Sequence, residues 1–464
     1  FYLYVFKYTS QYIPQCKALE RFELAAMMQI ANVAAILPVV TSYGPAQYSC
    51  VLEGSDTYYY DSEETIYKRL FQDLKEAVEW LKDFRDSSPS QDLLDDFKRA
   101  DKVCDGDIDK WIKFANTLRL RIAMQLVKVY PDSQKEAEDA VRDGVLTNSD
   151  SDVVLKSGLM LFRIEDLWND TRANANIISI LQGYSDPRLE RWFATNNADI
   201  YSTDDELSPV VEKATKYLGV RQGVPMTRTE YQGYSKTSRV GIPEQGPRPV
   251  LRVAEAYFLR AEGMLRNWNM GDGTPESLYN EGIHSAWASV LGDESGWAGT
   301  YESYINGFIN TEEGGDFDWE LFEGGFGSAP YINYRNQEYN YYIEENGKQV
   351  GINRISVRWH DEDSPEKKLQ RIITQKWISF FPTLSSVAWT EYRRTGYPKL
   401  IPIPSDLNYS NGAIDTELQI RRLPFTQSEY RGNTEEVNKA LGLLKGPDNG
   451  GTRLWWDVDK GNFE

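Results

Sequence analysis

The chain has 464 residues, of which 41% are hydrophobic and 26% charged, and its formal net charge is −19. This composition is typical of a globular protein with a large core. The excess of acidic residues argues against nucleic acid as a partner, because phosphate binding needs clustered Lys and Arg.

No membrane-spanning helix is expected, because the sequence lacks an uninterrupted apolar run of about 18 residues. The chain starts at Phe1 without a Met, a basic segment or an apolar segment. We therefore interpret the N-terminus as truncated, and the lack of a signal segment carries no information about secretion.

The first third of the chain shows helical periodicity. Apolar residues at three- and four-residue spacing, from Ile66 to Leu81 and from Trp111 to Val129, predict two amphipathic helices. Asp107 or Asp109 is the expected N-cap of the second. Shorter helices are expected over 15–36 and 134–145.

Helical periodicity returns in the second half. A stripe from Val250 to Trp268 predicts a helix with an i,i+4 ion pair between Glu262 and Arg266. Further helices are expected over 276–291, 366–381 and 385–394. We expect the side chains of Arg393 and Arg394 to donate hydrogen bonds to the C-terminal carbonyls of the helix over 385–394. The following Gly and Pro are expected to end this helix.

These patterns predict a mainly α fold with one domain over 1–464. Helices joined by short turns suggest tetratricopeptide-like helix pairs, although no clean sequence repeat is present. We expect a helical scaffold and irregular, aromatic-rich insertions, followed by a C-terminal segment. The expected bounds are about 10–146, 249–292 and 366–395 for the scaffold, 147–248 and 293–365 for the insertions, and 396–464 for the C-terminal segment.

The irregular insertions are the candidate binding side. Loops on a rigid scaffold commonly carry binding residues, and disorder is not expected in segments so rich in aromatic residues. An exposed indole or phenol ring covers the C–H face of a pyranose, while neighbouring polar side chains bond its hydroxyls. The alternative for each ring is that it fixes its loop to the core. The candidate ligand-binding residues are Tyr43, Tyr231, Tyr234, Trp297, Trp319 and Tyr331.

Catalytic and metal-binding signatures are scarce. Three scattered Cys and two distant His give no zinc pattern and no disulfide framework. The DGDID stretch at 105–109 is not a calcium loop, because Lys110 and Asn116 stand where the EF-hand needs Gly and Glu. No catalytic residue, metal site or cofactor is predicted. Two alternatives stay open: a helical glycoside hydrolase with a carboxylate pair, and a tetratricopeptide-type scaffold for protein interaction.

Several segments in order along the chain carry a family resemblance. They are TSYGPAQYS (41–49), YDSEETIYKRLFQDLKEAVEWL (60–81), GDIDKWIKFANTLRLRIAM (106–124), AEAYFLRAEGMLRNW (254–268), IITQKWISFF (372–381), AWTEYRRTGYPKL (388–400), RRLPFTQSEYRGN (421–433) and TRLWWD (452–457). Together they resemble the SusD/RagB family of Bacteroidetes outer-membrane nutrient-binding lipoproteins.

The resemblance implies tetratricopeptide-like helix pairs that support an irregular ligand-binding side. It implies a non-catalytic protein on the extracellular face of the outer membrane, held by a lipid anchor that this chain does not contain. It further implies that the protein binds a glycan or another nutrient and delivers it to a SusC-like TonB-dependent transporter. The YGPAQYS loop departs from the family pattern, which usually has an acidic residue before the Pro.

Overall fold

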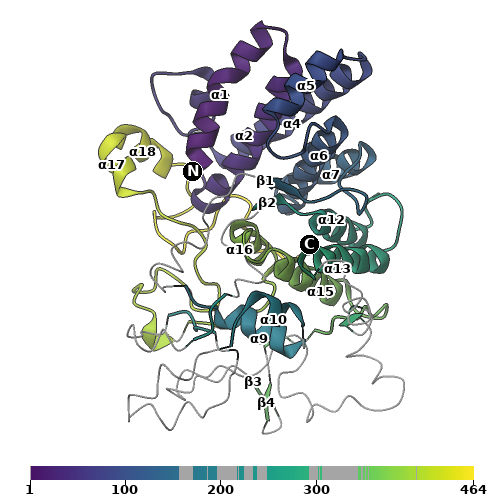
Figure 1. The fold of residues 1–464 in the computed structure, drawn as a ribbon. Helices are drawn as coiled ribbons and strands as arrows, with labels where there is room; N and C mark the ends of the chain where they lie inside the picture. The colour runs from purple at the N-terminus through teal and green to yellow at the C-terminus, as the bar shows by residue number, and fades with distance from the viewer. Residues whose placement is uncertain are drawn as a thin grey trace.

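The computed structural model is built mainly from α-helices (Figure 1). It describes residues 2–155, 171–184, 186–195, 217, 219–223, 234–237, 248–291, 301, 304–305, 343–345, 348–350, 352–353, 355–403 and 405–464.

The N-terminal part of the scaffold consists of helices. They are α1 (Tyr2–Ala18), α2 (Phe22–Tyr43), α3 (Ser49–Glu53), α4 (Glu63–Asp86), α5 (Gln91–Ala100), α6 (Ile108–Gln125) and α7 (Ser133–Arg142). The helix expected over 15–36 is therefore two helices. The chain turns between α1 and α2, because Glu20 has a φ of 55°, which is incompatible with a right-handed α-helix.

The remaining elements are more varied. They are β1 (Val153–Leu155), α9 (Ala175–Gly183), α10 (Arg188–Trp192), β2 (Arg248–Leu251), α12 (Val253–Leu265), α13 (Pro275–Leu291), β3 (Ile343–Glu345), β4 (Lys348–Val350), α15 (Pro365–Ser379), α16 (Ser385–Thr395), the 3-10 turn η4 (Ser405–Leu407), α17 (Gln427–Gly432) and α18 (Thr434–Leu441). Strand β1 pairs antiparallel with β2, and β3 with β4.

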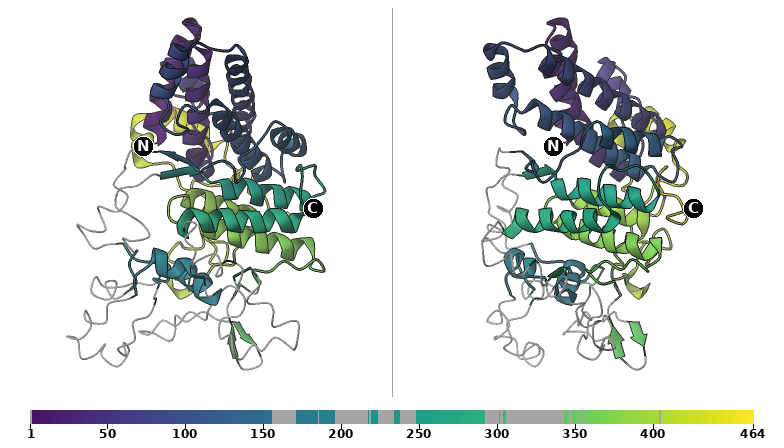
Figure 2. Two further views of the ribbon diagram at one scale, coloured as in Figure 1. Left: turned by 45° about the vertical axis from the view of Figure 1, so that its right-hand side comes forward. Right: turned by 90° about the vertical axis from the view of Figure 1, so that its right-hand side faces the viewer.

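Consecutive helices pack as pairs, and the pairs stack. Helix α1 lies against α2, α6 against α7 and α12 against α13, while α2–α4, α4–α6, α6–α12 and α12–α15 contacts join the pairs into one scaffold. The views in Figure 2 show α12, α13 and α15 side by side, with α9 and α10 below them at the end away from α1. The predicted mainly α fold with tetratricopeptide-like helix pairs is confirmed.

The predicted caps place the helix ends. Asp107 accepts a hydrogen bond from the backbone N–H of Lys110 at 2.9 Å and caps α6, which decides between the two candidates. Helix α16 ends at Gly396 in the left-handed conformation. Arg394 does not bind the helix carbonyls as expected, because it is buried and forms ion pairs with acidic side chains. Arg393 donates to one carbonyl of α16, that of Trp389 at 3.3 Å, and to the carbonyl of Arg421 at 2.7 Å.

Helix α2 is long and apolar enough to cross a membrane by length and composition alone. Its most apolar window is 67% buried in the structure, and α2 packs against both α1 and α4. A helix that is covered by neighbours on most of its faces needs apolar residues nearly all round. The apolar sequence of α2 is therefore that of a core helix.

The C-terminal segment returns along the scaffold to the start of α4. Trp455 stacks on Tyr67 with ring centroids 6.1 Å apart. Arg421 binds Asp457 with Nε and Nη2, and Arg393 lies between the rings of Trp389 and Trp456 at 3.5 and 4.8 Å. Helices α17 and α18 form a separate small apolar cluster with Tyr60.

Candidate functional site

Four of the candidate ligand-binding residues, Tyr231, Trp297, Trp319 and Tyr331, lie outside the described residues. Their proposed role therefore stays a prediction. The structure places the other two candidates, Tyr43 and Tyr234.

Tyr43 is the last residue of α2, and its side chain is half-buried. Its carbonyl accepts hydrogen bonds from Arg422 Nε and Nη2 at 3.2 and 3.0 Å. The backbone N–H of Leu423 donates to the carbonyl of Ser42 at 2.7 Å. The C-terminal end of α2 is thus fixed to the C-terminal segment through its backbone, and the Tyr43 phenol ring takes no part in these hydrogen bonds.

Tyr234 lies beside α9 and α10. The next residue, Ser235, accepts a hydrogen bond from the N–H of Ala173 at 2.8 Å, and Thr237 bridges to Phe193. Tyr234 is half-buried. It belongs to the end of the molecule formed by α9 and α10, whereas Tyr43 belongs to the surface next to the C-terminal segment.

A fully buried arginine organises this end of the molecule. Arg188 binds Asp186 through Nε at 2.9 Å and Nη2 at 2.6 Å, and neither side chain is accessible to solvent. The guanidinium lies 5.6 to 5.7 Å from the ring centroids of Trp192, Trp287 and Tyr304. Burial disfavours the charged form of Arg188, but Asp186 outweighs it, and the pKa of the guanidinium is raised.

This cluster anchors part of the aromatic-rich stretch to the scaffold. Tyr304 is buried, and its hydroxyl accepts a hydrogen bond from Gln375 Nε2 on α15 at 3.0 Å. Tyr301 donates to the carbonyl of Asn280 at 3.0 Å and packs edge-on against Trp287. For Tyr304 the packing interpretation holds, because its side chain is buried, and Tyr301 is held against α13 by its contacts with Asn280 and Trp287.

Sequence reasoning missed the Arg188–Asp186 pair. The two residues stand two apart within SDPRLERW, and the chain has 51 basic and 70 acidic residues. Nothing in that pattern sets one Asp–Arg neighbour apart from the others, because only tertiary packing buries it under three aromatic rings.

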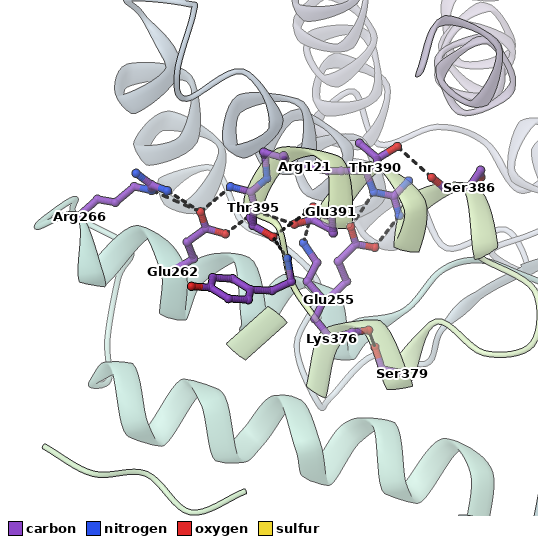
Figure 3. A network of polar contacts seen from close by, with 12 residues as sticks. Arg121, Glu255, Glu262, Arg266, Lys376, Ser379, Ser386, Thr390, Glu391 and Thr395 are labelled. Carbon is purple, nitrogen blue, oxygen red and sulfur yellow. Dashed lines mark hydrogen bonds and ion pairs between the residues drawn. The ribbon is translucent and has the colours of Figure 1, made fainter. Parts of the chain in front are cut away.

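A network of buried charges joins α6, α12, α15 and α16 (Figure 3). Arg394 binds both oxygens of Glu262, at 2.6 and 2.7 Å, and one oxygen of Glu391 at 2.5 Å. Lys376 also binds Glu391, at 3.0 Å. Beside them, Arg121 on α6 holds Glu255 on α12 with two hydrogen bonds of 2.7 and 2.5 Å.

Two carboxylates of this network, Glu262 and Glu391, are unsuited to general acid catalysis. Burial opposes ionisation of Glu262, but Arg394 and Arg266 outweigh it and hold the pKa of Glu262 at about 2. The pKa of Glu391 is likewise lowered by Arg394 and Lys376 against the effect of burial. A glycosidase needs one carboxylic acid that stays protonated near neutral pH, and neither group supplies it.

The space next to this network is small. A cavity of about 30 Å³ between α2, α6 and α16 is lined in part by Arg121, Gln125 and Glu391. It has room for one or two water molecules, but a sugar ring does not fit. Among the described residues, no group of three or more His, Cys, Asp or Glu is placed to hold a metal ion.

These observations define a mainly helical protein in which stacked helix pairs enclose a network of buried ion pairs. The family model of the SusD-like proteins, described as Susd and RagB outer membrane lipoprotein, matches residues 1–301 and 326–457. The chain belongs to this family.

Solved structures agree with the assignment. A chitin-binding SusD homologue from Flavobacterium johnsoniae is 35% identical with a TM-score of 0.77, over 95% of this chain and 82% of that one. A SusD homologue from Bacteroides uniformis is 30% identical with a TM-score of 0.79, over 98% and 85% of the two chains. A SusD-like protein from Bacteroides thetaiotaomicron is 30% identical with a TM-score of 0.75, over 94% and 82%. Comparison with curated proteins gives no match.

The family resemblance inferred from the sequence motifs is confirmed. The chain is a binding protein rather than an enzyme, as the members of this family are, and the family is one of outer membrane lipoproteins. The helical glycosidase alternative is thereby set aside.

Proposed function

We propose that the protein binds a glycan at the extracellular face of the outer membrane and delivers it to a SusC-like TonB-dependent transporter. The observation that carries the proposal is 35% identity, over 95% of the chain, to a chitin-binding SusD homologue.

The way in which the helical scaffold uses its polar groups supports the proposal that the protein binds a glycan. Polar groups in the helical scaffold are used internally, as in the Glu262–Arg394 pair, and the cavity beside them is too small for a sugar. A ligand is therefore expected on the outer surface, where the aromatic-rich segments leave the scaffold. The Arg188 cluster fixes Tyr304, which belongs to one of these segments, to the scaffold.

Oligosaccharides of β-1,4-linked N-acetylglucosamine are the first ligands to test. Each residue of this polymer offers a C–H face for a ring and an acetamido group for hydrogen bonds, so it suits an aromatic, polar surface. Shallow sites of this kind bind in the range of about micromolar to millimolar, which also allows release to a transporter.

The test is a glycan array that includes chitin oligosaccharides, followed by calorimetry and product analysis on the same samples. Binding without turnover is the expected result. Turnover of the glycan contradicts the proposal. If no glycan binds, the glycan half fails, and a peptide or other nutrient becomes the ligand to test.

The candidate rings can be tested directly. Trp297→Ala and Trp319→Ala should weaken glycan binding at least several-fold and leave Tm nearly unchanged. Trp192→Ala is the contrasting variant: its ring is 2% exposed and packs under Arg188, so it should lower Tm. The site assignment is wrong if the first two variants lower Tm and spare binding.

Delivery to a transporter predicts a stable or glycan-dependent complex between the two proteins. Co-purification of the protein with a co-expressed SusC-like transporter would measure this. Failure to associate, with and without glycan, contradicts the delivery half and leaves the binding half intact.

A further inference from the structure

A buried carboxyl group lies where three separate segments of the chain meet. Glu63 is the first residue of α4, and its side chain is only 5% exposed. The loop after α2 packs on it through Gly44, and the C-terminal segment binds it through the backbone of Trp455. These segments carry the sequence stretches YGPAQYS, YDSEE and LWWD.

The hydrogen bonding of Glu63 is incomplete. Its Oε2 accepts a hydrogen bond from the backbone N–H of Trp455 at 2.9 Å. Its Oε1 is buried and has no hydrogen-bond partner among the described residues. An ionised carboxylate in this position is poorly compensated, whereas a neutral carboxylic acid still accepts the Trp455 bond through its carbonyl oxygen.

The charged and titratable groups around Glu63 come from each neighbouring element. Arg393 on α16 and Arg422 and Lys445 of the C-terminal segment favour the ionised form, and Tyr67 faces it from α4 itself. None of the three cations forms an ion pair with Glu63 in the part of the chain that the structure describes; Arg422, for instance, binds Asp448.

The junction has little room to adjust. Gly44 has a φ of +88°, and a Cβ at this position would lie 2.9 Å from Leu454 Cδ2 and 3.3 Å from Glu63 Oε2. The loop after α2, the Glu63 carboxyl and the C-terminal segment are therefore in direct contact. A charge that develops on Glu63 cannot be solvated unless these segments separate.

We propose that Glu63 is a protonation-dependent latch: its neutral form holds the C-terminal segment against the loop after α2, and its ionised form loosens that contact. Because Arg422 of the same segment binds the Tyr43 carbonyl, loosening also frees the C-terminal end of α2, which carries Tyr43. The inference does not depend on the identity of the ligand.

The direction with pH follows from the buried position. Burial raises the pKa of Glu63 to about 7, against the opposing effects of the Trp455 hydrogen bond and the three cations. At a pH between the ordinary Glu pKa and about 7, the closed state binds more protons than the open state. The equilibrium constant for closure therefore falls as the pH rises through this range, and above pH 7 it stays at its low value. If opening restores the ordinary pKa, the closing equilibrium falls about tenfold between pH 6 and pH 8.

Hydrogen exchange of the full chain measures this at the amide that Glu63 binds. Peptides that contain Trp455, compared at pH 6 and pH 8 after correction for intrinsic exchange rates, should lose about tenfold in protection in the wild type. Glu63→Gln keeps an acceptor for the Trp455 N–H and cannot ionise, so its protection should not change with pH. Glu64→Gln, at the exposed neighbour that pairs with Lys68, should behave as the wild type does.

Equal pH dependence in the wild type and Glu63→Gln overturns the proposal. If Glu63→Gln does not fold, the wild type decides alone by NMR of ¹³C-labelled Glu carboxyls. A titration midpoint near pH 7 supports the latch, and a midpoint below pH 5 overturns it.

Discussion

Removing Arg394 should destabilise the scaffold strongly, because it leaves two buried acids short of a partner. The Arg394 side chain is fully buried and binds Glu262 and Glu391, which are 1% and 2% exposed. Breaking a buried ion pair from one side costs about 3–5 kcal/mol. Arg266 and Lys376 still contact the two acids, so we expect Arg394→Leu to lie near the lower end, at about 3 kcal/mol.

Urea unfolding followed by circular dichroism at pH 7 gives this number directly. Lys68→Ala is the matched control, since its ion pair with Glu64 has a similar length of 2.7 Å but both side chains are half exposed. The control should lose at most about 1 kcal/mol. A loss below about 1 kcal/mol for Arg394→Leu would refute the claim that this network holds α12 to α16.

The ion pair between Glu262 and Arg394 should make the stability of the fold depend on pH in the acidic range. The folded-state pKa of Glu262 is lowered, so its contribution to stability is present above the ordinary Glu pKa and is lost as pH falls toward about 2. The difference in unfolding free energy between the wild type and Arg394→Leu should therefore narrow as the pH is lowered from 5 to 3. A constant difference over that range contradicts the assignment.

Two further predictions concern the backbone and the thiols. Gly44→Ala should lower the unfolding free energy by about 1–3 kcal/mol, because a Cβ at this position clashes with the C-terminal segment. In the control variant Gly54→Ala the Cβ meets no atom within 4 Å, and the unfolding free energy should fall by about 1 kcal/mol. Equal losses of the two variants in urea unfolding contradict this reasoning. Burial raises the pKa of all three thiols, but Cys50 and Cys104 are buried while Cys16 is partly exposed, so brief alkylation of the folded protein read by mass spectrometry should label Cys16 first.

The sequence by itself determined the helices and the family. Helical periodicity is a local property, and the stripes starting at Ile66 and Trp111 correspond to α4 and α6 as predicted. Caps are equally local, which is why Asp107 and Gly396 could be identified as helix ends. The ordered motifs gave the family because each preserves the packing contacts of one helix or loop.

Only the tertiary structure decided how the charges are used. Glu262 was expected to pair with Arg266 at the helix surface, and it does so, but its other partner is Arg394, which lies 132 residues away in the chain. Nothing in the local sequence sets Glu63 apart in the first turn of its helix, and the backbone N–H that it binds belongs to Trp455, 392 residues further along the chain. Burial comes from segments distant in sequence, and it changes the free energy of a charge far more than any neighbour on the same helix can. For that reason periodicity found the scaffold, while the ionic interior and the Glu63 junction became visible only in three dimensions.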